Sequence, residues 1–192
     1  HLSSPVGVSG EQGTGPAERL TPPIVVLVIV LLSSLLIGFL THHYSSVPIL
    51  VNLSLFSMLS IIVGLVISIY GLSIYTMSGS QSIQWTIITV LLILATAGLI
   101  RVAFMAGPWV GWLLSVACVL FFTSPLLDMA MPNFSTNNLI AELYISIQAS
   151  SQNAFLTGML PLALIAALTI AVPIVRHAVI NRKKEEDDVY EM

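Results

Sequence analysis

Charged residues are scarce in this chain of 192 residues. Asp, Glu, Lys and Arg together make up 8% of the sequence, whereas soluble domains carry about 25%. No charged residue lies between Arg19 and Arg101, and from Leu20 to Val175 only Arg101, Asp128 and Glu142 are charged. So few charges cannot cover the surface of a soluble domain of this size. The sequence therefore excludes that class and indicates a chain whose solvent is lipid.

Metal-binding and nucleophilic residues are also few. Cys118 is the only cysteine, which excludes an intrachain disulfide and a site with several thiolates. The four histidines are His1, His42, His43 and His177, and no two of them face each other within one apolar run, so a haem held by two histidines is not expected. No catalytic triad or carboxylate pair is recognisable. We predict no enzyme active site, no metal site and no cofactor.

Long apolar runs are what the sequence does contain. Hydrophobic residues make up 56% of the chain, and they occur in uninterrupted stretches rather than in alternation, which favours membrane helices over a β-barrel. Five stretches are long enough to cross a membrane, at about 23–40, 47–72, 83–104, 109–131 and 155–180. The sequence predicts an all-α, polytopic helical bundle at 22–181, between a flexible polar tail at 1–21 and a charged tail at 182–192.

Basic residues set the expected orientation. Arg176, Arg182, Lys183 and Lys184 gather at the end of the last span, and such clusters mark the cytoplasmic side. Five spans then place the amino terminus outside, as expected for a chain whose signal peptide has been removed. The bilayer and other membrane subunits are the expected partners, and nucleic acid is not.

The loop between the fourth and fifth spans contains a short amphipathic pattern. Five apolar residues repeat with helical spacing, namely Leu139, Ile140, Leu143, Tyr144 and Ile147, and Asn138 is suited to cap the start. This predicts a short outer helix that lies on the membrane surface, docks onto a partner or, as we favour, covers the bundle. The nearby sequence Asn133-Phe-Ser matches a glycosylation acceptor.

Arg101 is the only charged residue expected inside a span other than at its ends. Its position about two turns before the turn at Gly107 would let a long side chain reach cytoplasmic headgroups, as an anchor that orients the chain. The alternative is a functional residue that faces a polar path or a cofactor, since charges within membranes often have such roles. We favour the anchor, and Asp128 is expected too near the opposite face to pair with it.

Small residues recur at every fourth position on three spans. The three ridges are Ser60, Gly64 and Ser68; Gly107, Gly111 and Ser115; and Ala163, Ala167 and Ala171. Such ridges let helix backbones approach closely, either within the bundle or between subunits.

These features favour a non-catalytic accessory or structural subunit of a larger membrane complex, such as an energy-converting or oxidoreductase assembly. One alternative is a small transporter or channel component in which Arg101 and the Ser and Thr residues of the second and third spans line a path. A second alternative is a structural protein of an envelope or cell surface.

Overall fold

The computed structural model describes residues 23–44, 46–75, 77–130, 138–149 and 152–190, and within them every element of regular secondary structure is a helix. The helices are α1 (Ile24–His43), α2 (Ile49–Ile74), α3 (Gly79–Ala106), α4 (Pro108–Ala130), α5 (Leu139–Gln148) and α6 (Gln152–Tyr190). All except α5 are long and apolar enough to cross a membrane. The predicted all-α, polytopic membrane bundle is therefore confirmed.

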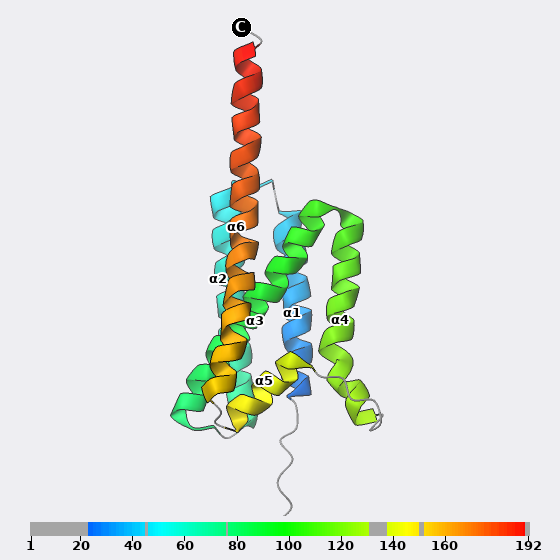
Figure 1. The fold of residues 1–192 in the computed structure, drawn as a ribbon, viewed down its shortest axis with the longest axis vertical. Helices are drawn as coiled ribbons and strands as arrows, with labels where there is room; N and C mark the ends of the chain where they lie inside the picture. Colours follow the sequence, from blue (N-terminus) through cyan, green and yellow to red (C-terminus); the bar gives the residue numbers. More distant parts are fainter. Residues whose placement is uncertain (1–22, 45, 76, 131–137, 150–151, 191–192) are drawn as a thin grey trace, which may run out of the picture.

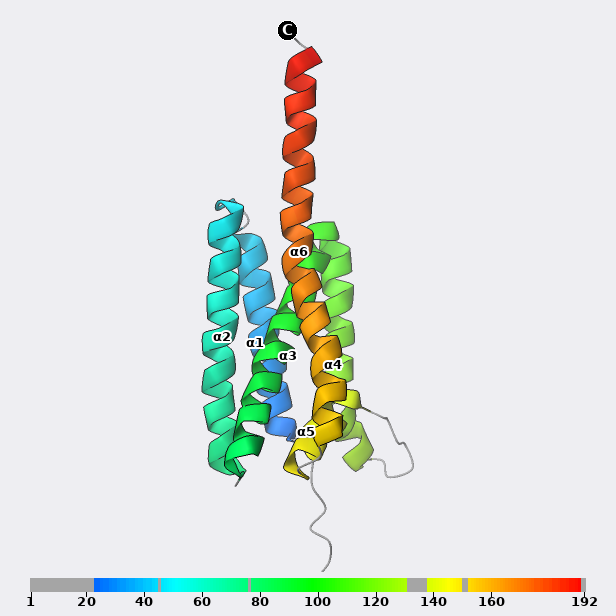
Figure 2. The same ribbon diagram turned by 60° about the vertical axis from the view of Figure 1, so that its left-hand side comes forward.

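The bundle has two distinct ends. At one end α5 lies across the other helices, and at the opposite end the carboxyl-terminal part of α6 extends beyond them (Figure 1, Figure 2). Helix α6 continues without interruption through Pro161 and Pro173 to Tyr190, so the chain between 182 and 190 is helical. The predicted tail at 1–21 lies outside the described residues.

Local sequence explains where the helices begin and end. Pro23 and Pro48 directly precede α1 and α2, where the missing N–H of proline costs little. Helix α3 begins four residues before the predicted span because Ser78 and Gln81 form a capping box, in which the backbone N–H of Ser78 donates to Gln81 Oε1 at 2.8 Å. Gly107 ends α3 and lies in the tight turn to α4.

Helix α3 is the centre of the bundle. It packs against each of the five other helices, and it crosses behind α6 and in front of α1 in Figure 1. Its middle is rich in small side chains, and Ala95, Ala97, Gly98 and Ala103 are all buried. Without a hydrophobic driving force between helices in lipid, this close approach of backbones is what holds such helices together.

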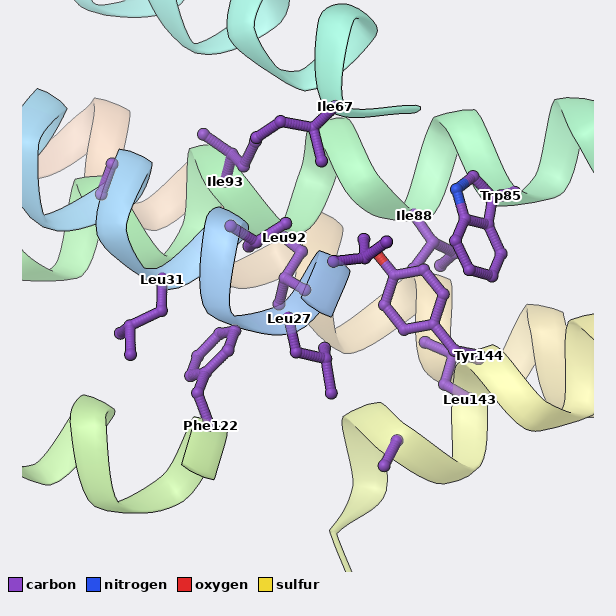
Figure 3. Close-up of a cluster of buried hydrophobic side chains, with 14 of the residues drawn as sticks. Leu27, Leu31, Ile67, Trp85, Ile88, Leu92, Ile93, Phe122, Leu143 and Tyr144 are labelled. Carbon is purple, nitrogen blue, oxygen red and sulfur yellow. The ribbon is translucent and has the colours of Figure 1, made fainter. Parts of the chain in front are cut away.

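The interior between α3 and its neighbours is filled by apolar side chains. Figure 3 shows Leu27 and Leu31 of α1 and Ile67 of α2 gathered against the face of α3 that carries Ile88, Leu92 and Ile93. Phe122 of α4 closes this cluster from one side, and Leu143 and Tyr144 of α5 close it from another. The cluster is continuous, so all the helices share one core.

Helix α5 is a cover over the bundle. The side chain of Asn138 caps it by accepting from the N–H groups of Ile140 and Ala141, both at 3.0 Å, as the sequence predicts. Tyr144 is fully buried against the edge of Trp85, with a ring separation of 4.5 Å, and its hydroxyl lies 2.8 Å from the Thr89 hydroxyl. Burial raises the pKa of the Tyr144 hydroxyl above its ordinary value.

The contact between α3 and α6 gives a direct test of this packing. A Cβ atom added at Gly98 would collide with the side chain of Thr169, whereas one added at Gly79 would meet nothing within 4 Å. We expect Gly98→Ala to lower the free energy of unfolding by about 1–3 kcal/mol, the usual cost of overpacking. Gly79→Ala is the matched control and is expected to leave stability unchanged or slightly higher. Thermal unfolding of both variants in mild detergent checks this, and equal midpoints would contradict the packing.

Candidate functional site at the arginine end of the bundle

Arg101 lies within the bundle near the end of α3. Its side chain is only 4% exposed. Its Nη2 donates to Asn52 Oδ1 of α2 at 2.6 Å, and its guanidinium carbon lies 5.3 Å from the centre of the Phe56 ring. A charge-assisted hydrogen bond and a cation–π contact are the interactions that make a buried guanidinium tolerable. The arginine is therefore held between α2 and α3.

Asn52 connects three parts of this end of the bundle. Its Nδ2 donates to the carbonyl oxygens of Thr41 and Tyr44, both at 2.9 Å, and so closes the carboxyl end of α1. Since both amide protons are used in this way, only the amide oxygen is left to face Arg101. An aspartate at this position could not make the same contacts, because it has no donor.

A second arginine closes the end of α3. Arg176 of α6 donates from Nη1 to the carbonyl oxygen of Met105 at 2.7 Å. A cation at a helix carboxyl terminus is favourable because it meets both the free carbonyl groups and the negative end of the helix dipole. The ends of α1 and α3 thus receive donors from α2 and α6, respectively.

These side chains line a pocket of about 520 Å³ at the end of the bundle from which α6 projects. Its polar lining includes Arg101 and Asn52 together with Thr41, His42, Arg176 and His177, and none of the described residues that line it is acidic. Two of these lining residues each have a buried nitrogen without a hydrogen-bond partner, Arg101 Nη1 and His42 Nδ1. The pocket therefore combines positive charge with unused hydrogen-bonding capacity.

The sequence interpretation of Arg101 and the structure differ in one respect. The anchor hypothesis directs the side chain toward headgroups, whereas the structure gives it Asn52 and Phe56 as partners inside the bundle. Sequence reasoning missed Asn52 as the partner. The sequence does mark Asn52 as a candidate partner, because it is the one side-chain amide in the apolar stretch 47–72. A lone amide buried among apolar residues needs hydrogen-bond partners.

The first small-residue ridge lies between α2 and α3. Ser60 and Ser68 are buried, and Ser68 donates to the Thr86 hydroxyl at 2.9 Å. A Cβ atom at Gly64 would lie 2.8 Å from Val90 Cγ2, so the backbones are close there. This ridge lies at a contact within the bundle.

The other two ridges are arranged differently. Gly107 lies in the turn, while Gly111 packs against the ring of Phe104 and Ser115 is buried one turn further along α4. On α6, Ala163 is half-buried, whereas Ala167 and Ala171 are exposed on the outside of the bundle. The first two ridges are thus largely used within the chain, and the third is largely free.

Two further sequence predictions concern other positions. Asn133 lies outside the described residues, so its glycosylation stays a prediction. Among the residues that the structure describes, no three His, Cys, Asp or Glu side chains lie close enough together to hold a metal ion.

Comparison with known proteins gives one informative similarity. The chain is 40% identical over 193 residues to the ESX secretion system protein YueB of Bacillus subtilis (strain 168). The similarity covers 100% of this chain but 18% of that relative, so the chain corresponds to a minor part of the relative's length. No family model and no solved structure matches the chain.

The link between Arg101 and Asn52 can be measured by a double-mutant cycle. Asn52→Leu is expected to lower the free energy of unfolding by about 3–5 kcal/mol, because it leaves a buried cation without its acceptor. Arg101→Met alone should lower the free energy of unfolding by a smaller amount. The double variant should be about 0.5–3 kcal/mol more stable than the sum of the two single effects predicts.

Thermal unfolding in detergent, followed by tryptophan fluorescence, provides these free-energy differences. Asn181→Leu is the matched control, because Asn181 is exposed on α6 and contacts only His177 among the interactions found for it. Additive effects of Arg101→Met and Asn52→Leu would show that the two side chains are not coupled.

Proposed function

We propose that this chain is a non-catalytic, membrane-embedded part of a secretion apparatus, in which it packs against other membrane subunits. The similarity to the ESX secretion system protein carries this proposal, because it extends over the whole chain and so includes all five candidate spans and α5. It favours a secretion complex over the energy-converting or oxidoreductase assembly suggested by the sequence alone.

The interior of the bundle supports a packing role. Several polar side chains of α2 and α3 that a transport path would need are engaged in contacts between helices, although Ser60 Oγ is buried without a hydrogen-bond partner. Ser68 is bonded to Thr86, and Thr89 contacts the Tyr144 hydroxyl. Large apolar side chains fill the space between these pairs. This arrangement favours a packed bundle over the alternative of a transporter that uses Arg101.

The outer surface of α6 is the part that we propose contacts another subunit. Ala167 and Ala171 are exposed on it, and Ala163 continues the row. A row of small residues permits close contact with a neighbouring helix, which larger lipid-facing side chains would prevent. The first two ridges lie largely against helices of the same chain. The ridge on α6 differs from them in being available to a helix of another subunit.

The orientation belongs to the same proposal. Arg101 and Arg176 lie at one end of the bundle, and Arg182 lies further along α6 in the same direction. By the positive-inside rule this end is cytoplasmic, which puts the start of α1 and the cover helix α5 on the outer side. The amino-terminal tail would then be extracytoplasmic.

Copurification tests the proposed function. The complete protein that contains this chain is affinity-purified from native membranes in mild detergent, and its partners are quantified by mass spectrometry. We expect other membrane proteins in fixed ratio to it, and we expect Ala167→Phe to reduce their recovery at least about tenfold, since one lost packing contact is worth 1.4 kcal/mol or more.

Ala117→Phe is the matched control for this experiment. Ala117 is exposed on α4, so the same enlargement there changes a surface outside the proposed contact. The thermal stability of both variants shows whether the bundle itself is intact. If the protein is recovered only with copies of itself, or if both variants keep their partners equally, the proposed packing role is wrong.

A further inference from the structure

We propose that the pocket at the arginine end of the bundle binds a phosphate-type anion, either the phosphate of a lipid headgroup or free phosphate. This proposal concerns Arg101, Arg176 and the start of α2. The site itself does not depend on the proposed secretion function, and the choice of a lipid headgroup rests on the orientation proposed with that function. A built site of this kind differs from a general basic surface, because its donors are fixed by contacts within the bundle.

The strongest observation is the unused half of the Arg101 guanidinium. Its Nη2 is bonded to Asn52, which fixes the plane of the group, while its Nη1 is buried without a partner. Arg101 is one of the residues that line the pocket. Leaving a buried charged donor unsatisfied is costly, so native proteins seldom do so without a ligand or water to accept from it. A phosphate oxygen is the natural acceptor for a guanidinium N–H.

The start of α2 supplies a second group of donors. Val47, Pro48 and Ile49 lie on the pocket wall, and no described side chain caps the amino end of this helix at Pro48. The first N–H groups of a helix have no partner within it, and they carry the positive end of its dipole. A helix amino terminus of this kind is a favourable place for an anion.

The remaining charges in the pocket agree with an anionic ligand. Arg176 brings a second guanidinium, of which Nη1 is bonded to Met105, and His42 and His177 lie on the same wall. The two helix carboxyl ends nearby would repel an anion, but Asn52 and Arg176 already donate to their carbonyl groups. No described residue of the wall carries negative charge.

The position of the pocket indicates where the anion comes from. The pocket lies where α1 and α3 end and α2 begins, so its depth is that of the boundary between the apolar core and the headgroups. Anionic phospholipids are concentrated in the cytoplasmic leaflet, the side to which the positive-inside rule assigns this end. A lipid headgroup is therefore the first source to test.

Binding is measured on the complete protein in nanodiscs and by native mass spectrometry. One arm compares phosphatidylcholine with phosphatidylcholine containing phosphatidylglycerol, and scores the lipid adducts that survive release from the nanodisc. The other arm adds inorganic phosphate in pure phosphatidylcholine and scores the midpoint of thermal unfolding. We expect the protein to retain at least about tenfold more phosphatidylglycerol than phosphatidylcholine. One charge-assisted hydrogen bond is sufficient to give a selectivity of this size.

Three variants make the result specific to the pocket. Arg176→Gln keeps an amide donor for Met105 but removes a charge from the wall, and it should abolish most of the preference for the anion. Arg101→Lys keeps a charge near Asn52 but has one nitrogen where the guanidinium has two terminal ones. It should also abolish most of the preference for the anion. Arg182→Gln is the control, because it removes the same charge from α6 at a residue outside the pocket.

The outcomes separate the source of the anion from the existence of the site. Retention of phosphatidylglycerol identifies a headgroup, and stabilisation by inorganic phosphate alone identifies a soluble anion; either result supports the proposal if Arg176→Gln removes it. Absence of both effects would overturn the site. So would a preference that Arg182→Gln weakens as much as Arg176→Gln does, because the anion would then be attracted by general surface charge.

Discussion

The structure depends on one helix that packs against all the others. Helix α3 contacts all five other helices, and its small side chains bring their backbones close to its own. In lipid, apolar surface gains little by leaving its solvent, so this close packing must supply the stability that the hydrophobic effect gives a soluble core. The places of α1, α2, α4 and α6 are set by how closely each can approach α3, and α5 closes the end of the same core through Tyr144.

The central position of α3 also decides what happens to its one charge. Arg101 cannot leave the bundle without disturbing the helices around it, so its guanidinium must be stabilised within it. The neutral amide of Asn52 accepts a hydrogen bond from the guanidinium, and because the same amide closes the end of α1, the arginine becomes part of the connection between three helices. The other terminal guanidinium nitrogen, Nη1, is buried without a hydrogen-bond partner. In the proposed site, Nη2 has the structural role and Nη1 the binding role within one guanidinium group.

Sequence patterns were sufficient for some of these features because those features are local. The spans follow from runs of apolar residues, and α5 and its cap follow from helical spacing and Asn138. The fate of Arg101 could not be predicted in the same way. A helix that is apolar all round has no polar face to show its orientation, so the sequence does not reveal whether Arg101 turns toward lipid or toward Asn52. The small-residue ridges show the same limit of sequence reasoning. They have the same spacing in the sequence, yet Gly64 packs against Val90 inside the bundle whereas Ala167 is exposed on the outside.

The contact between Arg101 and Asn52 is the claim on which the account of the site rests most directly. Solid-state nuclear magnetic resonance on the protein in lipid bilayers, with 15N in the arginine guanidinium groups and 13C in the asparagine side-chain carbonyls, measures it as a dipolar coupling. The structure, with Nη2 and Oδ1 at 2.6 Å, places the Asn52 carbonyl carbon one bond beyond the oxygen and predicts a measurable coupling that disappears in Arg101→Lys. Absence of that coupling in the unaltered protein would mean that Arg101 faces lipid headgroups, and the site described above would not exist.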